Sequence, residues 1–314
     1  MARAATHRGI VVGVDGSSAS TVAVQWAARD AVLRKVPLTL VHMLLPPATM
    51  TWPAVRLPPE FQQWQEAQGR RIIRDAAAIG HDVVGADSIQ INSEVVTGEP
   101  VASLIDLSKD AHMIVVGRHG RGRLQHVLNS VSSGLARHAY CPVAVVHDEE
   151  PLMPAPAFAS VVVGIDGSPA SQSATAIAFD EASRRGVDLV AVHACIDWGG
   201  WGCPDIDWST AEPAGHVLLA ERLSGWQELY PDVTVRRVVV ANQAAAHLIE
   251  ESERAQLVVV GSHGRGGFAG MLLGSVSSAL VQSARIPVIV AREPSAAASA
   301  DRAVSADSTE IGRS

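Results

Sequence analysis

Residues 258–278 of the chain read Val258-Val-Val-Gly-Ser-His-Gly-Arg-Gly-Gly-Phe-Ala-Gly-Met-Leu-Leu-Gly-Ser-Val-Ser-Ser278. The apolar run at 257–260 is short, β-branched and ended by glycine, which predicts a buried strand. Glycine allows positive φ angles or a close approach of the backbone to a ligand, and Ser275, Ser277 and the amides of a new helix can face an anion. The order predicts a phosphate-binding turn. The alternative of plain turn glycines is weaker, because all of them lie between one strand and one helix. They are Gly261, Gly264, Gly266, Gly267 and Gly274.

The same order occurs earlier in the chain, where residues 114–133 read Ile114-Val-Val-Gly-Arg-His-Gly-Arg-Gly-Arg-Leu-Gln-His-Val-Leu-Asn-Ser-Val-Ser-Ser133. An Asp-Gly-Ser motif also follows a β-branched run twice, at Asp15 and at Asp166. The chain is therefore a tandem repeat. At 314 residues it is long enough for two domains that each bury a core.

Strand and helix patterns alternate through each half, and each half opens with strand, helix, strand, which requires a parallel sheet and a right-handed crossover. We expect an α/β fold of two tandem doubly wound domains, each an open five-stranded parallel sheet flanked by helices. Expected strands lie at 9–14, 38–42, 89–96, 114–117 and 142–146, and again at 160–165, 189–193, 233–240, 257–260 and 287–290. Expected helices lie at 18–35, 60–79, 100–108 and 131–138, and again at 171–185, 214–230, 244–254 and 276–284, with Ser17 or Ser18 capping the first.

Domain boundaries follow from composition. Residues 1–147 form the first predicted domain and 160–292 the second. The segment 148–159 is charged and then proline-rich, as in a semi-rigid linker, and 293–314 is rich in Ala, Ser and Asp, as in a disordered tail. The least regular segments, 44–60 and 196–214, carry Trp52, Trp198, Trp201 and Trp208, and either fold over a site as lids or simply cover the sheet edge.

Overall composition excludes several classes of protein. Hydrophobic residues make up 47% and charged residues 18% of the chain, which suits a compact α/β protein. A net charge of −7 and a pI near 5.9 leave no basic face for nucleic acid or anionic lipid. The sequence shows no membrane span and no secretory segment, so we expect a cytoplasmic protein. Its three cysteines share no Cys-x-x-Cys spacing and are interpreted as incidental thiols; they are Cys141, Cys195 and Cys203.

Ligands of open doubly wound sheets bind beyond the carboxyl ends of the strands. Asp15 and Asp166 follow the first strand of each half, so each carboxylate could hold a ribose hydroxyl or, through water, a Mg²⁺ ion. Either could instead make local hydrogen bonds that cap the following helix.

Four histidines lie at the same end of the predicted sheet. His42 and His193 end the second strands without a partner carboxylate or nucleophile at a suggestive spacing, and a structural role is favoured for both. His119 and His263, beside Arg121 and Arg265 in the glycine turns, could contact phosphate or remain solvated. The glycine spacing matches neither the dinucleotide fingerprint nor the P-loop, and no metal cluster or nucleophile elbow occurs.

Three elements that recur in order in both halves resemble the universal stress protein family. They are Val-Gly-x-Asp-Gly-Ser after the first strand, Val-His at the end of the second, and Gly-x2-Gly-x9-Gly-Ser after the fourth. The resemblance covers residues 9–147 and 160–292, and the tandem arrangement looks like the two-domain members of actinobacteria, mycobacteria among them. It implies a cytoplasmic ATP-binding protein of the stress response, and members with the glycine pattern bind ATP.

The resemblance also implies particular site residues. In the second half Gly261, Gly264, Gly274 and Ser275 match the ATP-binding pattern. Asp166 and the backbone at Ala194 would hold adenosine, and Ser275, Val276 and Ser277 would hold phosphate. In the first half the matching positions are Asp15, Met43, Gly117, Gly120, Ser130, Val131 and Ser132. The first turn is one residue shorter and has Asn129 where the pattern requires glycine, so we expect weakened binding there.

Three functions remain open from the sequence. The leading one is a regulatory protein in which bound ATP and Mg²⁺ order the glycine turns and bias contacts with other proteins. The second is a slow nucleotide hydrolase or phosphotransferase that uses Asp15 or Asp166 with Mg²⁺, and it is weakened by the lack of an evident general base near the phosphates. No catalytic or metal-binding residue is assigned. The third is a nucleotide-free interaction module. Pairing of fifth strands, between the halves or between chains as in a homodimer, is implied by the resemblance alone.

Overall fold

The computed structural model describes residues 8–46, 60–86, 89–118, 130–148, 158–195, 208–265 and 273–292. Within these ranges the first half contains β1 (Ile10–Gly13), α1 (Ser18–Arg34), β2 (Leu38–Leu44), α3 (Phe61–Val84), β3 (Ile91–Thr97), α4 (Pro100–Leu107), β4 (Met113–Arg118), α6 (Ser130–His138) and β5 (Val143–His147). The second half contains β6 (Ser160–Gly164), α7 (Pro169–Arg185), β7 (Leu189–Ala194), α8 (Trp208–Leu229), β8 (Val235–Val240), α9 (Ala244–Ser252), β9 (Ala255–Gly261), α10 (Ser275–Ser283) and β10 (Val288–Ala291).

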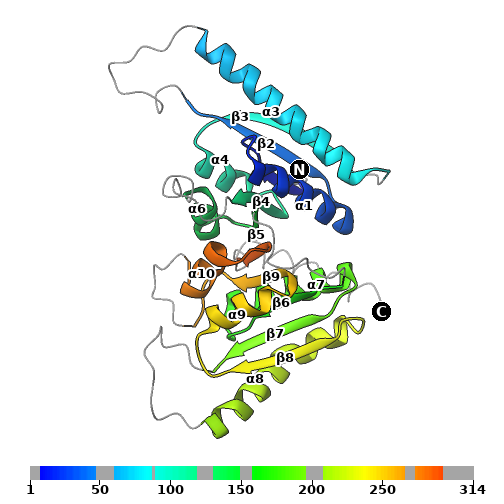
Figure 1. The fold of residues 1–314 in the computed structure, drawn as a ribbon, viewed down its shortest axis with the longest axis vertical. Helices are drawn as coiled ribbons and strands as arrows, with labels where there is room; N and C mark the ends of the chain where they lie inside the picture. The colour runs from blue at the N-terminus through cyan, green and yellow to red at the C-terminus, as the bar shows by residue number, and fades with distance from the viewer. Residues whose placement is uncertain are drawn as a thin grey trace, which may run out of the picture.

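All ten strands form one sheet, in the order β3-β2-β1-β4-β5-β10-β9-β6-β7-β8 (Figure 1). Within each half every pair of neighbouring strands is parallel. The halves meet at one antiparallel pair, in which Ile289 of β10 lies opposite Ala144 of β5. The predicted fold class is confirmed, and so is the pairing of the two fifth strands inside the chain.

Helices cover both faces of the sheet, because successive residues of a strand point to opposite faces. Ile10 and Val12 of β1 pack with α1, α3, α7 and α8 in one apolar core. Val11, between them, belongs to a second core on the other face, with α4, α6, α9 and α10. The central strands are therefore apolar, as expected of a parallel sheet buried on both sides, whereas the edge strands β3 and β8 carry polar and charged residues.

Two helices are longer than predicted. α3 continues to Val84, and α8 begins at Trp208, in a segment predicted to be loop, although Pro213 lies within it and cannot donate an amide hydrogen bond. The rest of the predicted lids, 47–59 and 196–207 with Trp52, Trp198 and Trp201, lies outside the described residues. Linker residues 149–157 and the tail from 293 also lie outside them.

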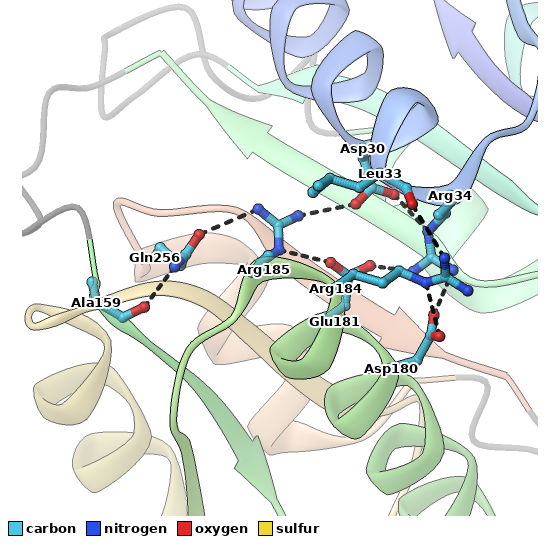
Figure 2. A network of polar contacts seen from close by, with 9 residues as sticks. All are labelled: Asp30, Leu33, Arg34, Ala159, Asp180, Glu181, Arg184, Arg185 and Gln256. Carbon is cyan, nitrogen blue, oxygen red and sulfur yellow. Dashed lines mark hydrogen bonds and ion pairs between the residues drawn. The ribbon is translucent and has the colours of Figure 1, made fainter. Parts of the chain in front are cut away.

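A buried ring of four charged residues forms a second junction between the halves (Figure 2). Arg34 of α1 bonds Asp30 on its own helix at 2.8 Å and also bonds Glu181 of α7. Arg185 of α7 bonds Glu181 at 2.8 Å and reaches back to Asp30 at 3.0 Å. The two carboxylates are fully buried, and Arg185 also lies over the ring of Trp26 at 5.7 Å. Each guanidinium thus neutralises one carboxylate of its own half and one of the other.

The two carboxylates of the ring are not equivalent. Burial, and then the negative charge of Glu181, raise the pKa of Asp30 to about 6. Burial alone would also raise the pKa of Glu181, but the charges of Arg185 and Arg34 lower it overall. Glu181 is therefore the more strongly paired of the two anions.

Candidate functional site

The Asp-Gly-Ser motif forms the same turn in both halves. Asp166 Oδ1 accepts hydrogen bonds from the Ser168 amide at 2.9 Å and from its hydroxyl at 2.7 Å. Asp15 Oδ1 accepts the matching bonds from Ser17 at 2.9 and 2.6 Å. Ser17 and Ser168 are the N-caps of α1 and α7. One oxygen of each carboxylate therefore has the local role considered from the sequence, although the serine and not the aspartate is the cap.

The second oxygen of Asp166 holds the glycine turn. Asp166 Oδ2 accepts a hydrogen bond from the amide of Arg265 at 3.0 Å. A Cβ atom at Gly264 would lie 2.4 Å from the same oxygen, so only glycine allows this approach. The turn after β9 and the turn after β6 are thus tied together by one carboxylate, which is half-buried there.

The base of the glycine turn closes through Ser262. Its carbonyl accepts hydrogen bonds from the Gly274 amide at 2.7 Å and from the Ser277 hydroxyl at 3.1 Å. Ser277 is buried, so its hydroxyl supports the turn and does not face an anion as the sequence suggested. Ser262 Oγ also lies 3.0 Å from Nδ1 of His263, which directs that imidazole toward the base of the turn.

The first turn of α10 has donors but no cap. Gly274, its N-cap, has no side chain to accept a hydrogen bond, whereas the Ser168 hydroxyl caps α7 at 3.2 Å. In the described part of the chain, no protein acceptor is recorded for the amides of Ser275, Val276 and Ser277. Among the described residues, no side chain caps the positive end of this nine-residue helix, which lies beside the turn that Asp166 holds.

Two of the predicted glycines have a packing role. A Cβ atom at Gly261 would lie 2.8 Å from the carbonyl carbon of Ala170 in α7, and one at Gly117 would lie 2.2 Å from the carbonyl oxygen of Ala19 in α1. Each glycine lets the end of β4 or β9 approach the backbone of a helix. The close approach predicted at Gly261 is thus made to the protein itself.

The histidines at the strand ends have the structural role favoured from the sequence. His193 Nδ1 lies 2.7 Å from the carbonyl oxygen of Ile165, and His42 Nδ1 lies 2.7 Å from that of Val14. A carbonyl oxygen only accepts, so each Nδ1 carries the proton. Burial lowers the pKa of His193, and the charge of Arg265 adds to that shift. Each ring therefore ties the end of its strand to the neighbouring strand.

The other predicted positions lie at the same end of the sheet where they are described. Met43 lies one residue before the end of β2 and pairs with Val96, and Ala194 ends β7 and pairs with Val240. Val131 and Val276 pack partly buried on the apolar core, and Ser132 is buried. Ser130 begins α6. His119, Gly120, Arg121, Asn129, Gly266 and Gly267 lie outside the described residues.

Two serines complete the site but are absent from the predicted set. Ser168 holds Asp166 in place, and Ser262 closes the glycine turn. The repeated Asp-Gly-Ser motif signals Ser168, because a serine two residues after an aspartate is placed to form such a turn. No sequence signal marks Ser262, because its main-chain carbonyl makes the bond and any residue type would provide one.

Neither metal coordination nor thiol chemistry is evident in the described ranges. They contain no group of three His, Cys, Asp or Glu side chains placed to hold a metal ion. Cys141 and Cys195 are free thiols, and burial raises the pKa of Cys141 to about 12, which leaves it protonated and unreactive. Cys203 lies outside these ranges. Among the helices they include, none has both the length and the apolar composition needed to cross a bilayer.

Comparison with known proteins identifies the fold and the family. A universal stress protein of Mycobacterium tuberculosis is 55% identical over 287 residues, which is 91% of this chain and 96% of that protein. The crystal structure of a universal stress protein from Archaeoglobus fulgidus covers 92% of this chain and 99% of its own, with a TM-score of 0.66 and 17% identity. A universal stress protein family member from Arabidopsis thaliana, solved with AMP bound, covers 46% of this chain and 95% of its own, with a TM-score of 0.34 and 18% identity. The sequence model of the family matches residues 6–147 and again 157–292. The chain belongs to the universal stress protein family, in its tandem form.

Proposed function

We propose that the chain binds ATP, with its Mg²⁺ ion, in the second half, and that occupancy of this site sets the conformation in which it contacts other proteins. The observation that carries the proposal is the uncapped first turn of α10 beside the turn held by Asp166. Amide donors at a helix N-terminus bind phosphate, since the helix dipole favours negative charge there. The tandem family relationship supports the proposal, and we place the protein in the cytoplasm as part of it.

The residues present fit a nucleotide with phosphates. The amides of Ser275, Val276 and Ser277 would hold phosphate oxygens, and the main chain at Ala194 would lie beside the nucleoside. Asp166 would contact the ribose, or the Mg²⁺ ion through water, in exchange for its bond to the Arg265 amide. Binding would therefore change how the glycine turn is held, which gives occupancy a structural consequence.

The hydrogen bonds that the histidines near the site already make favour nucleotide binding without hydrolysis. Two imidazoles lie near the site: buried His193 already donates Nδ1–H to the carbonyl of Ile165, and Nδ1 of His263 lies 3.0 Å from the Ser262 hydroxyl. A general base must lie within hydrogen-bond reach of the water or hydroxyl that it activates. Because His193 is used to hold two strands together, we expect hydrolysis to be slow or absent.

The test uses the full chain and compares two matched variants. Asp166→Ala removes the anchor of the glycine turn, and we expect ATP affinity in the second half to fall about ten-fold or more, because hydrogen bonds to charged groups contribute about 1.5–3 kcal/mol. Asp15→Ala is the control and should have the smaller effect on total ATP binding. Affinity and stoichiometry are measured by titration calorimetry with ATP and Mg²⁺, after any nucleotide released on denaturation has been identified.

Two results would contradict the proposal. A folded, nucleotide-free chain that takes up no ATP would favour an interaction module that works without nucleotide. Steady release of ADP at rates typical of an enzyme would favour the hydrolase alternative.

A further inference from the structure

The C-terminal end of α10 is held by the other half of the chain. The carbonyl oxygen of Val281, in the last turn of α10, accepts hydrogen bonds from Nε2 of His147 at 3.0 Å and from Nη1 of Arg118. His147 ends β5 and Arg118 ends β4, both in the first half. Carbonyls in the last turn of a helix have no donor within the helix. Here the first half supplies the missing donors.

The second half makes the mirror-image contact. Arg292 directly follows β10 and holds the position in the second half that His147 holds in the first. Its Nη1 donates a hydrogen bond to the carbonyl oxygen of Ala136 in α6 at 3.1 Å. Ala136 holds the position in α6 that Val281 holds in α10, counted from Ser130 and Ser275. The contacts are therefore crossed, and each site helix is held at its C-terminal end by the opposite half.

Arg118 makes the crossed contacts unequal. It immediately follows Gly117, at the start of the first glycine turn, and its side chain is buried although it is charged. The matching position in the second half is Ser262, which is too short to reach across and instead closes its own turn. Within the described residues, Arg118 and His147 both bond to the C-terminal end of α10, and Arg292 bonds to that of α6.

We propose that, through these hydrogen bonds, each half positions the anion-binding helix of the other half. Arg118 is then the main positioning residue for the second-half site. The inference rests on the proposed function, because it concerns the site that the first turn of α10 would form. α10 has nine residues, so it is only about 13 Å long at 1.5 Å per residue. A short helix moves as a rigid piece, and freedom at its C-terminal end displaces the amides at its N-terminal end. A cation at the C-terminal end also stabilises the helix through its dipole.

The experiment measures ATP affinity separately in each half. Asp15→Ala leaves the second-half site for titration, and Asp166→Ala leaves the first-half site. In the first background we expect Arg118→Ser, which places the residue of the matching position there, to weaken ATP binding about five-fold or more. In the second background Arg118→Ser should have little effect, whereas Arg292→Ala should weaken the binding that remains.

A substitution that weakens ATP binding in the opposite half alone indicates positioning of the helix and not a general loosening of the interface between the halves. Loosening would weaken both halves alike and lower the melting temperature in proportion, and equal losses in the two backgrounds would overturn the inference. Arg118→Lys, which keeps a cation with donors, should restore most of the second-half affinity. If Arg118→Ser does not fold, the Arg118→Lys and Arg292→Ala variants test the inference. Unchanged first-half ATP affinity after Arg292→Ala in the Asp166→Ala background would also overturn it. Absence of ATP binding in the unaltered chain would instead remove the proposed function.

Discussion

The two halves form the same Asp-Gly-Ser turn but surround it differently. Asp15 is exposed and accepts hydrogen bonds from Ser17, and the turn that corresponds to 263–265 lies outside the described residues. Asp166 is half-buried, because the turn after β9 reaches over it and donates the Arg265 amide to its second oxygen. A motif of three residues therefore sets the local turn, but a distant segment decides whether its carboxylate belongs to a site. Because the first turn is one residue shorter and has Asn129 where the second has Gly274, we expect the two sites to differ in strength.

The junction between the halves shows the opposite tendency, since it is almost symmetric. Asp30 and Glu181 hold matching positions in α1 and α7, and so do Arg34 and Arg185. Each arginine bonds both carboxylates, so two of the four ion pairs lie within a half and two join the halves. The halves have diverged at their sites more than at the surface where they meet.

The largest effect is expected at this junction. Within the ring, Glu181→Ala leaves two guanidiniums against one fully buried carboxylate, because the remaining partner of Arg34, Asp180 at 3.0 Å, is partly exposed. Removal of one partner of a buried ion pair costs about 3–5 kcal/mol. Asp30→Ala should cost less, because Asp30 is the less strongly paired anion. The free energy of unfolding is measured by urea denaturation.

The control for this comparison is Arg184→Ala. Arg184 pairs with Asp180 at 2.8 Å on the more exposed side of the network, and such pairs contribute at most about 1 kcal/mol. If Asp30→Ala and Glu181→Ala are equally destabilising, the inequality of the two carboxylates is refuted.

The packing glycines come next. Gly117→Ala would place a methyl group 2.2 Å from the carbonyl oxygen of Ala19, and Gly261→Ala would place one 2.8 Å from the carbonyl carbon of Ala170. Overpacking of this kind costs about 1–3 kcal/mol, and the first half should lose more because the approach there is closer. Urea denaturation without nucleotide provides the measurement. Gly225→Ala, with open space around it in α8, should be neutral or slightly stabilising.

Most of the fold could be predicted because local sequence patterns specify its strands, turns and helices. β-branched runs, Asp-Gly-Ser turns and alternating helices recur twice, and the strands they predicted are the strands observed. The start of α8 was missed because Trp208 and Pro213 resemble loop residues, and only packing of the helix against β7 and β8 overrides that preference.

The sequence predicted at which end of the sheet the candidate site residues lie, but not the hydrogen bonds between them. The sequence brings Asp166 and Gly264 to the same end of the sheet, yet the bond from Arg265 to Asp166 joins segments far apart in the chain. The same holds for Ser277, whose hydroxyl turns inward to the carbonyl of Ser262. Hydrogen bonds of this kind depend on how two turns meet, which no local pattern specifies.

A third prediction uses pH to separate the two carboxylates of the junction. The pKa of Asp30 is raised to about 6 in the folded chain, from 3.8 when unperturbed. The folded state therefore takes up a proton that the unfolded state does not, and the stability contributed by this group rises as pH falls through about 6. Asp30→Asn lacks this gain, so its stability deficit relative to the unaltered chain should grow between pH 7 and pH 5.

Glu181→Gln serves as the comparison for the titration. The pKa of Glu181 is lowered from 4.5, so Glu181 is mostly ionised in both states over this range, and the deficit of its variant should change little. Urea denaturation at pH 7, 6 and 5 tests both variants. A deficit of Asp30→Asn that shrinks toward pH 5 would reverse the assigned direction of the shift.

The smallest effect is expected where α3 and α8 cover the two Asp-Gly-Ser turns. The guanidinium of Arg222 lies over Gly167 in the second half, 3.5 Å from the place of a Cβ atom, and Ile72 lies over Gly16 in the first. An exposed cation at the rim should favour a triphosphate by no more than a surface ion pair does, so Arg222→Ile should weaken ATP binding about two- to five-fold. Ile72→Arg should strengthen first-half binding by a similar factor.

Ligand charge and salt decide whether the rim effect is electrostatic. The loss caused by Arg222→Ile should be largest for ATP, smaller for AMP and absent for adenosine, and it should fade as ionic strength rises because the side chain is exposed. Titration of the three ligands at two salt concentrations measures both trends. If adenosine binding falls as much as ATP binding, Arg222 acts by packing over Gly167, and the difference between the halves at this turn is one of shape.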